Sequence, residues 1–137
     1  MTLVREAMVP DPKVLTASAS AQEAAELLVK PDVRAVLVVD GDRLVGLVTT
    51  GVLVERVVAA GLDPRTTSAG EVAEPVTLSV SPDTSVEDAY RVMEEHDVER
   101  LPVTEGDRLV GVLSRSALTR RLAEDEPPAA DPELAQT

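Results

Sequence analysis

One hexapeptide occurs twice in this sequence, and the two copies are 65 positions apart. Gly-Asp-Arg-Leu-Val-Gly occupies residues 41–46 and returns unchanged at residues 106–111. The same offset aligns Ser20 with Ser85, and it holds without an insertion from residue 6 to about residue 57 of the first copy. Chance recurrence of a short peptide does not extend over such a length, so we interpret the chain as one structural unit present twice.

Each copy is about 60 residues long, which is too short to bury a large core alone. We therefore expect the two repeats to share one core. This core is expected to be aliphatic, because 44% of the residues are hydrophobic while the chain has no Phe, no Trp and only Tyr90 as an aromatic residue. A ligand with an aromatic ring would consequently meet aliphatic side chains instead of stacking on another ring.

The charge and the composition exclude several classes of partner and site. The net charge of −12 repels phosphate backbones and anionic lipids, so we predict neither a nucleic-acid nor a membrane partner. The absence of cysteine removes disulfides and thiolate chemistry. His96 is the only histidine and has no metal-ligand spacing around it, so we predict no metal site. Without an apolar run of about 20 residues or a signal peptide, we expect a cytoplasmic protein.

Hydrophobic periodicity predicts the same series of elements in both repeats. Ser20 and Ser85 are each followed three residues later by a carboxylate, which is the spacing of a helix-capping box. Pro31 and Asp97 are expected to end the helices that begin there. The expected elements of the first and second repeat are a strand (14–16 and 76–80), a helix, a β-hairpin (35–48 and 101–113) and a final helix (52–60 and 117–123).

This organisation divides the chain into four segments. They are the first repeat with a short lead-in (1–61), a connector (62–68), the second repeat (69–123) and a tail (124–137). The tail is acidic and rich in proline, with few residues to bury, so we predict that it is disordered.

Two motifs of the second repeat resemble the cystathionine-β-synthase (CBS) domain. They are the Asp-Val-x-x-Leu-Pro-Val segment at 97–103 and the Gly-Asp-Arg-Leu-Val-Gly-Val-Leu-Ser run at 106–114. Two such repeats in tandem resemble a Bateman module, and the likeness extends from residue 2 to about residue 122. It implies an α+β fold in which two internal CBS repeats, β-α-β-β-α each, form one pseudo-two-fold CBS pair. Segments 59–64 and 69–71 are also similar to the stand-alone actinobacterial CBS proteins of the hypoxic-response type.

The resemblance implies a small ligand in the cleft between paired repeats and no resident cofactor. The possible ligands are AMP, ADP, ATP and S-adenosylmethionine. The candidate ligand-binding residues are Arg34, Ala35, Thr49, Thr50 and Val52 in the first repeat and Arg100, Pro102, Ser114, Arg115 and Ala117 in the second. Among these side chains, a hydroxyl at the start of a helix and a planar guanidinium are groups that bind phosphate well.

Both repeats depart from the nucleotide-binding pattern of the family. In the family an Asp, three residues after a Thr or Ser at the helix start, holds the ribose hydroxyls, whereas this sequence has Val52 and Ala117 there. Loss of such a hydrogen bond costs about 1–3 kcal/mol of affinity. Two hypotheses follow. The chain is a regulatory module that senses a small anionic ligand, foremost an adenine nucleotide, or it is a non-liganded dimeric scaffold or interaction protein.

Both hypotheses include the homodimer that the resemblance implies, formed through helix faces. A sensor would transmit ligand binding through dimer conformation to an unknown protein effector. The aliphatic residues of the final helices that are available for the core or for the dimer are Val54, Val57, Val58, Leu118 and Leu122. No nucleophile with a nearby base, Walker-type loop or distinctive carboxylate pair is present, so we predict no catalytic residues and no enzymatic activity.

Overall fold

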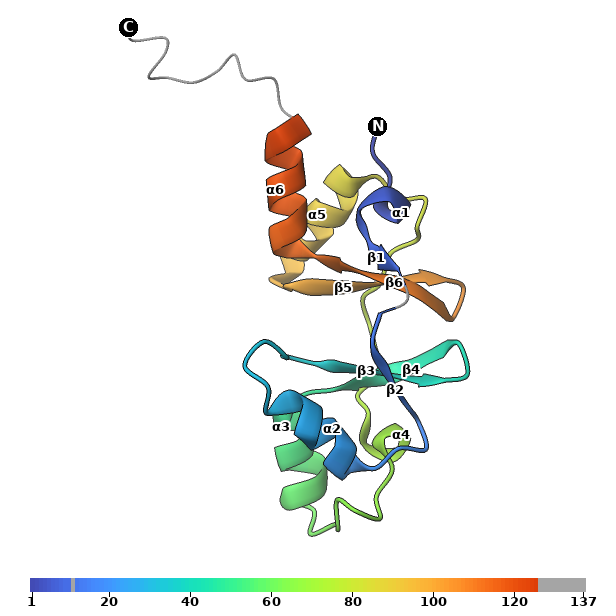
Figure 1. Ribbon diagram of the computed structural model, residues 1–137, viewed down its shortest axis with the longest axis vertical. Helices are drawn as coiled ribbons and strands as arrows, with labels where there is room; N and C mark the ends of the chain where they lie inside the picture. Colours follow the sequence, from blue (N-terminus) through green and yellow to red (C-terminus); the bar gives the residue numbers. More distant parts are fainter. Residues whose placement is uncertain (11, 126–137) are drawn as a thin grey trace, which may run out of the picture.

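The computed structural model describes residues 1–10 and 12–125 and has two lobes, each with helices packed on strands (Figure 1). The elements in chain order are α1 (Val4–Ala7), β1 (Val9–Pro10), β2 (Val14–Thr16), α2 (Ala21–Leu28), β3 (Val36–Asp40), β4 (Arg43–Val48), α3 (Thr50–Leu53), the π-helical η1 (Val54–Val58), α4 (Ala69–Val72), α5 (Val86–His96), β5 (Arg100–Glu105), β6 (Arg108–Ser114) and α6 (Arg115–Asp125). The strands follow the order β1-β6-β4-β3-β2, with β5 paired to β6. The α+β class predicted from the sequence is confirmed.

The helix signals in the sequence have the expected physical basis. The Ser20 hydroxyl accepts a hydrogen bond from the Glu23 amide at 3.1 Å, and the Ser85 hydroxyl accepts one from the Asp88 amide at 3.2 Å. Each bond satisfies a backbone donor that has no partner inside the helix. Helix α5 ends where Asp97 adopts a left-handed conformation with φ of 52°. The predicted starts of α2 and α5 and the predicted end of α5 are therefore confirmed.

The strand expected at 76–80 is wrong. Only Val80 pairs there, in a single parallel bridge to Val103 of β5. The Val80 amide donates to the carbonyl of Pro102, and the Thr104 amide donates to the carbonyl of Val80. Proline has no N–H, so Pro102 cannot donate the next bond of a parallel ladder, and pairing stops after one residue.

The two lobes exchange their lead-in segments. Helix α1 packs in the second lobe beside α5, although it precedes the first repeat, and α4 packs in the first lobe beside α2 (Figure 1). Strand β1 pairs with β6, placing Val9 opposite Val112, and the equivalent Glu74 bridges to Leu47 of β4. Each lobe therefore contains the lead-in segment that precedes the other repeat in the sequence.

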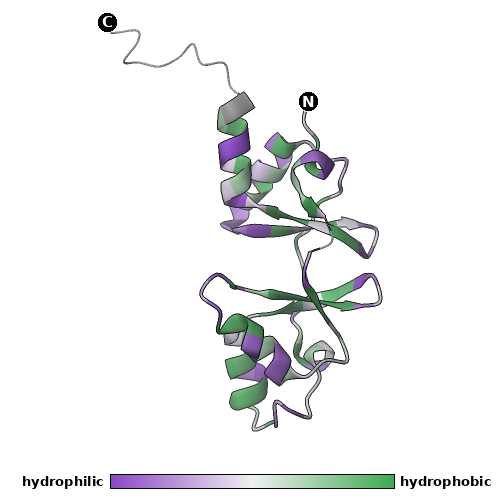
Figure 2. Cartoon of the chain, viewed as in Figure 1, coloured by the Kyte–Doolittle hydropathy of each residue, from purple (hydrophilic) through white to green (hydrophobic). Residues whose placement is uncertain are grey.

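The expectation of one shared core is also wrong, because the buried residues form two separate clusters. The first-lobe core consists of Ala21, Ala24, Val38, Val48, Val52, Val57, Ala69 and Val72. The second-lobe core consists of Val4, Val80, Val86, Ala89, Met93, Leu101, Val103, Leu113 and Leu118. Hydrophobic residues are concentrated on the strands and on the helices facing them (Figure 2). The exchanged segments supply residues to both cores, which explains how two small cores are each made large enough.

The repeated hexapeptide forms the main-chain junction between the lobes. The Leu44 amide donates to the Asp107 carbonyl at 2.8 Å, and the Leu109 amide donates to the Asp42 carbonyl at 2.9 Å. Reciprocal ion pairs join Arg43 to Asp107 at 3.4 Å and Arg108 to Asp42 at 3.3 Å. The two hairpin tips thus contact each other across the pseudo-two-fold axis. The ion pairs of this contact use Asp42 and Arg43 and their counterparts Asp107 and Arg108, which are identical in the two copies.

The final helices differ between the lobes. In the first lobe the helix changes from α to π at Val54 and ends before Gly61, whose φ is +73°. In the second lobe α6 is α-helical and continues to Asp125, so residues 124 and 125 of the predicted tail are helical. The remainder of that tail, 126–137, lies outside the described residues. Within the described part of the chain, no helix is long and apolar enough to cross a membrane.

Candidate functional site

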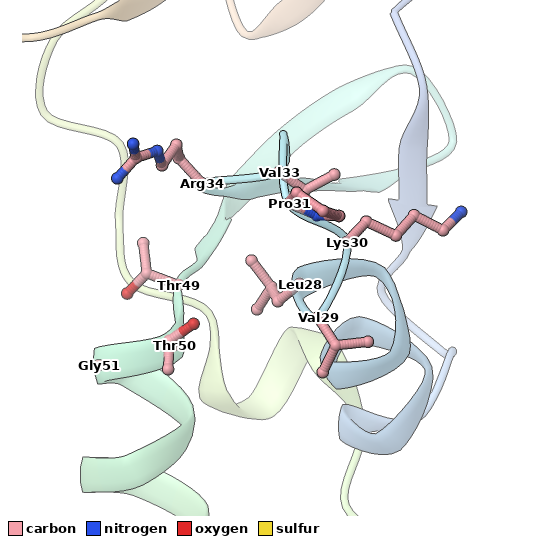
Figure 3. A pocket seen from close by; sticks show the side chains of 9 residues that line it. All are labelled: Leu28, Val29, Lys30, Pro31, Val33, Arg34, Thr49, Thr50 and Gly51. Atoms are coloured by element: carbon pink, nitrogen blue, oxygen red, sulfur yellow. The ribbon is translucent and has the colours of Figure 1, made fainter.

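A pocket of about 560 Å³ opens in the first lobe (Figure 3). It lies between the end of α2, the segment that leads into β3, and the start of α3. Its lining residues are Leu28, Val29, Lys30, Pro31, Val33, Arg34, Thr49, Thr50 and Gly51. Three of the candidate residues from the first repeat, Arg34, Thr49 and Thr50, are brought together here.

One side of the pocket is polar. Arg34 and Thr49 lie on this side, whereas the Lys30 ammonium extends away from the threonines in the same view (Figure 3). The Thr49 hydroxyl accepts a hydrogen bond from the Val52 amide at 3.1 Å and so caps α3. A hydroxyl that accepts one bond still has a proton to donate. Arg34, Thr49 and Thr50 therefore border the same pocket, and the Arg34 guanidinium extends outward from it in Figure 3. Their donor groups suit an anionic oxygen group.

The other side of the pocket is aliphatic and is formed by Leu28, Val29, Pro31 and Val33. Val29 is 81% exposed, so a ligand seated there would cover apolar surface that water now contacts. Burial of apolar area contributes about 25 cal/mol per Å². The pocket is thus amphipathic and fits a molecule with an anionic end and an apolar body.

The remaining first-repeat candidates lie outside the lining. Val52 is only 6% exposed and belongs to the first-lobe core. Ala35 is exposed and follows Arg34 without lining the pocket. No carboxylate is among the nine lining residues, so the pocket offers no acidic acceptor for sugar hydroxyls.

The second-repeat candidates lie on the other lobe. The Ser114 hydroxyl accepts a hydrogen bond from the Ala117 amide at 3.4 Å and lies 2.9 Å from the Ser116 hydroxyl. Strand β5 carries the exposed Arg100 and the buried Pro102. None of these five residues lines the first-lobe pocket, and the ligand-binding role of all ten stays a prediction.

Arg115 is held by carboxylates of the second lobe. Its Nη1 lies 3.2 Å from Asp97 and 3.8 Å from Glu99, and its side chain is 24% exposed. Partial burial disfavours the charged guanidinium, but hydrogen bonds to Asp97 and Tyr90 and the charge of Glu99 outweigh this and raise the pKa of Arg115. Arg115 is therefore a paired cation whose two carboxylate partners, Asp97 and Glu99, are 94% and 71% exposed.

Sequence reasoning missed most of the aliphatic side of the pocket. The sequence predicts only a helix end at Pro31 and gives no ligand-binding signal at Leu28, Val29 or Lys30. The available signal is positional, because these residues lie at or just after the end of α2 and shortly before Arg34, which is a candidate ligand-binding residue. Metal ligands were not expected, and in the described part of the chain no group of three His, Cys, Asp or Glu could hold a metal ion.

Comparison with known proteins agrees with this architecture. The family model of the CBS domain matches residues 4–59 and 69–124. Hypoxic response protein 1 of Mycobacterium tuberculosis is 42% identical over 85 residues, which are 62% of this chain and 59% of that protein. CBS domain-containing protein YhcV of Bacillus subtilis is 32% identical over 114 residues, or 83% of this chain and 81% of that protein.

Solved structures give the same result. A crystal structure of hypoxic response protein I with two coordinated zinc ions superimposes with a TM-score of 0.75 and 34% identity, covering 88% of this chain and 99% of that chain. CBSX2 in complex with AMP also gives a TM-score of 0.75, with 28% identity and coverage of 90% and 98%. The predicted family resemblance is confirmed. The chain belongs to the CBS domain family and is a tandem CBS pair of the actinobacterial hypoxic-response type.

Proposed function

We propose that this regulatory CBS pair senses a small anionic ligand, foremost an adenine nucleotide, in the first-lobe pocket. Binding there would alter the arrangement of a homodimer, and this change would transmit the signal to a protein effector. Such a switch requires that the ligand bind the two dimer arrangements with different affinity. The observation that carries the proposal is the pocket itself, in which Arg34, Thr49 and Thr50 lie opposite an aliphatic side.

The chemistry of the pocket supports this choice of ligand. A guanidinium binds a phosphate through two parallel hydrogen bonds, and threonine hydroxyls add donors. The aliphatic side suits an apolar ring. The AMP complex of CBSX2, a structural neighbour, is a precedent for an adenine nucleotide on this fold. The four-residue α3 is too short to serve as an anion site by its N-terminus alone, so Arg34 supplies the principal attraction.

Thermal unfolding in the presence of AMP, ADP, ATP and S-adenosylmethionine, each at about 1 mM, tests the proposal. A ligand that binds only the native state raises the free energy of unfolding by about 2.7 kcal/mol at 100 times its Kd. We expect a saturable rise in Tm for at least one adenine nucleotide. Arg34→Glu introduces the residue found at the equivalent position 99, and we expect it to lower the affinity at least about tenfold.

Arg65→Glu is the matched control, because Arg65 is an exposed arginine on the connector whose partner is Asp63. This variant is expected to keep the affinity of the unmodified chain. If no compound raises Tm, or if Arg34→Glu and Arg65→Glu bind equally well, the proposed ligand site is wrong.

A second candidate function, a dimeric scaffold without a ligand, is favoured by the lack of a lining carboxylate and by two exposed valines. Val54 is 54% exposed and Val58 is 72% exposed, and both lie on η1, whereas Val57 is buried in the first-lobe core. Apolar side chains left in water on one helix favour a protein contact. Figure 2 shows this helix as more hydrophobic than the equivalent α6.

Replacing Val54 and Val58 by glutamate is expected to convert the dimer to monomer, because buried unpaired carboxylates oppose association. Sedimentation velocity of the variant and of the unmodified chain measures this. Val9→Glu, at a valine that is 60% exposed on the other lobe, is the control and should stay dimeric. Persistence of a dimer in the double variant would exclude η1 from the interface.

A further inference from the structure

The second repeat has charges of the opposite sign at two of the positions that line the first-lobe pocket. The offset of 65 residues places Glu95 at the position of Lys30 and Glu99 at the position of Arg34. It also places Arg115 at the position of Thr50, at the start of the final helix. The two cationic positions of the first-repeat site are thus carboxylates in the second, and one hydroxyl position is an arginine.

The structure explains this reversal. Arg115 is the first residue of α6, and its guanidinium reaches Asp97 and Glu99 on the segment between α5 and β5. In the first lobe the corresponding segment, 31–35, and the start of α3 border the open pocket. Arg115 therefore spans, in the second lobe, the same gap that is open to a ligand in the first.

A backbone contact reinforces the closure. The Arg115 amide donates a hydrogen bond to the Glu99 carbonyl at 2.8 Å, which joins the start of α6 to the segment before β5. Among the described residues, no corresponding backbone bond joins Thr50 to Arg34. This backbone bond thus joins the two segments at the second-repeat site and not at the first.

Both features act against an anion in the second lobe. An incoming phosphate would meet the carboxylate of Glu99 where the first lobe offers Arg34. It would also compete with Asp97 and Glu99 for Arg115, whose side chain is 24% exposed while the two carboxylate side chains are 94% and 71% exposed. Because Arg115 is already paired, a new anionic ligand would replace one pairing by another, which lowers the net gain in affinity.

We propose that each chain binds one phosphate-bearing small molecule, in the first-lobe pocket, and that Arg115, held by Asp97 and Glu99, closes the second-repeat site to anions. The inference rests on the proposed function, since it concerns the number and position of the ligands. Arg115 acts as an internal substitute for the ligand's interactions. A dimer of this chain would accordingly bind two ligands instead of four, and its two lobes would respond differently to ligand.

The test is a titration with AMP and a separate titration with pyrophosphate. Calorimetry measures the stoichiometry, and amide chemical shifts locate the bound ligand. We expect one AMP per chain. The amides of residues 49–52 should shift with either probe, while those of residues 114–117 should not. Pyrophosphate reports on the anion site alone, whereas AMP also tests the aliphatic side of the pocket.

A charge-swapped variant tests the closure itself. Glu99→Arg with Arg115→Thr gives the second repeat the residues of the first at these two positions, and we expect its AMP stoichiometry to rise from one to two per chain. Arg120→Thr, at an exposed position on the same helix, is the control and should remain at one. The amide spectrum of each variant verifies that it is folded. If the swapped variant does not fold, the amide chemical shifts of the unmodified chain at residues 49–52 and 114–117 remain the test of the inference.

The failures can be told apart. Two AMP molecules per unmodified chain, or shifts at residues 114–117 equal to those at 49–52, would overturn this inference while leaving the proposed function intact. A folded swapped variant that still binds one AMP would refute the role of Arg115. No response to either probe at either site would overturn both proposals.

Discussion

Replacement of Val4 by aspartate is expected to lower the free energy of unfolding by about 4 kcal/mol, although residue 4 lies near the chain terminus. Val4 has no exposed surface and belongs to the second-lobe core with Val86 and Met93. A carboxylate there would be removed from water and would face only apolar neighbours. Chemical denaturation followed by far-UV circular dichroism measures the loss.

Val9→Asp provides the matched control, because Val9 belongs to the same lead-in but is 60% exposed on β1. Its cost should be about 1 kcal/mol or less, from the poor strand propensity of aspartate. Equal effects of the two substitutions would mean that α1 does not pack in the second lobe as described. A large difference would establish that the first residues of the chain are part of a core.

The local elements followed from the sequence because their signals are local. Capping serines, a 3.6-residue period and glycine-containing turns each act within a few residues, so α2, α5 and both hairpins were predictable. The exchange of the lead-ins was not, because the short apolar pattern of residues 2–8 says nothing about which repeat it packs against. That ambiguity also produced the wrong expectation of a single core.

The candidate site was predictable in part. Arg34, Thr49 and Thr50 were singled out by resemblance to a family pattern, and they line one pocket. The aliphatic side could not be assigned, because a leucine near a helix end is more often a core residue than a ligand contact. The charge reversal at positions 95 and 99 is visible in the sequence, but its meaning depends on the contacts of Arg115 with the segment between α5 and β5, which only the structure gives.

The final glycine of the hexapeptide provides the second large prediction. Gly46→Ala would place a Cβ 2.5 Å from the Glu74 carbonyl oxygen and 3.0 Å from the Ala73 Cβ. That carbonyl accepts a hydrogen bond from the Leu47 amide at 2.9 Å, so it cannot retreat without breaking the bridge that holds the exchanged segment. We expect the free energy of unfolding to fall by about 3 kcal/mol, near the upper end for overpacking.

Gly51→Ala is the control, because a Cβ at position 51 would meet only the Thr49 hydroxyl, at an ordinary 3.8 Å, in the first turn of α3. Alanine has the better helix propensity, so this variant should be unchanged or more stable by up to about 1 kcal/mol. Urea unfolding of both variants measures their free energies of unfolding. If Gly46→Ala were as stable as Gly51→Ala, the close approach of residues 73–74 to β4 would be refuted. If it is strongly destabilised, Gly46 is required by a contact between segments, and its recurrence as Gly111, which meets Met8 and Val9 in the other lobe, has the same cause.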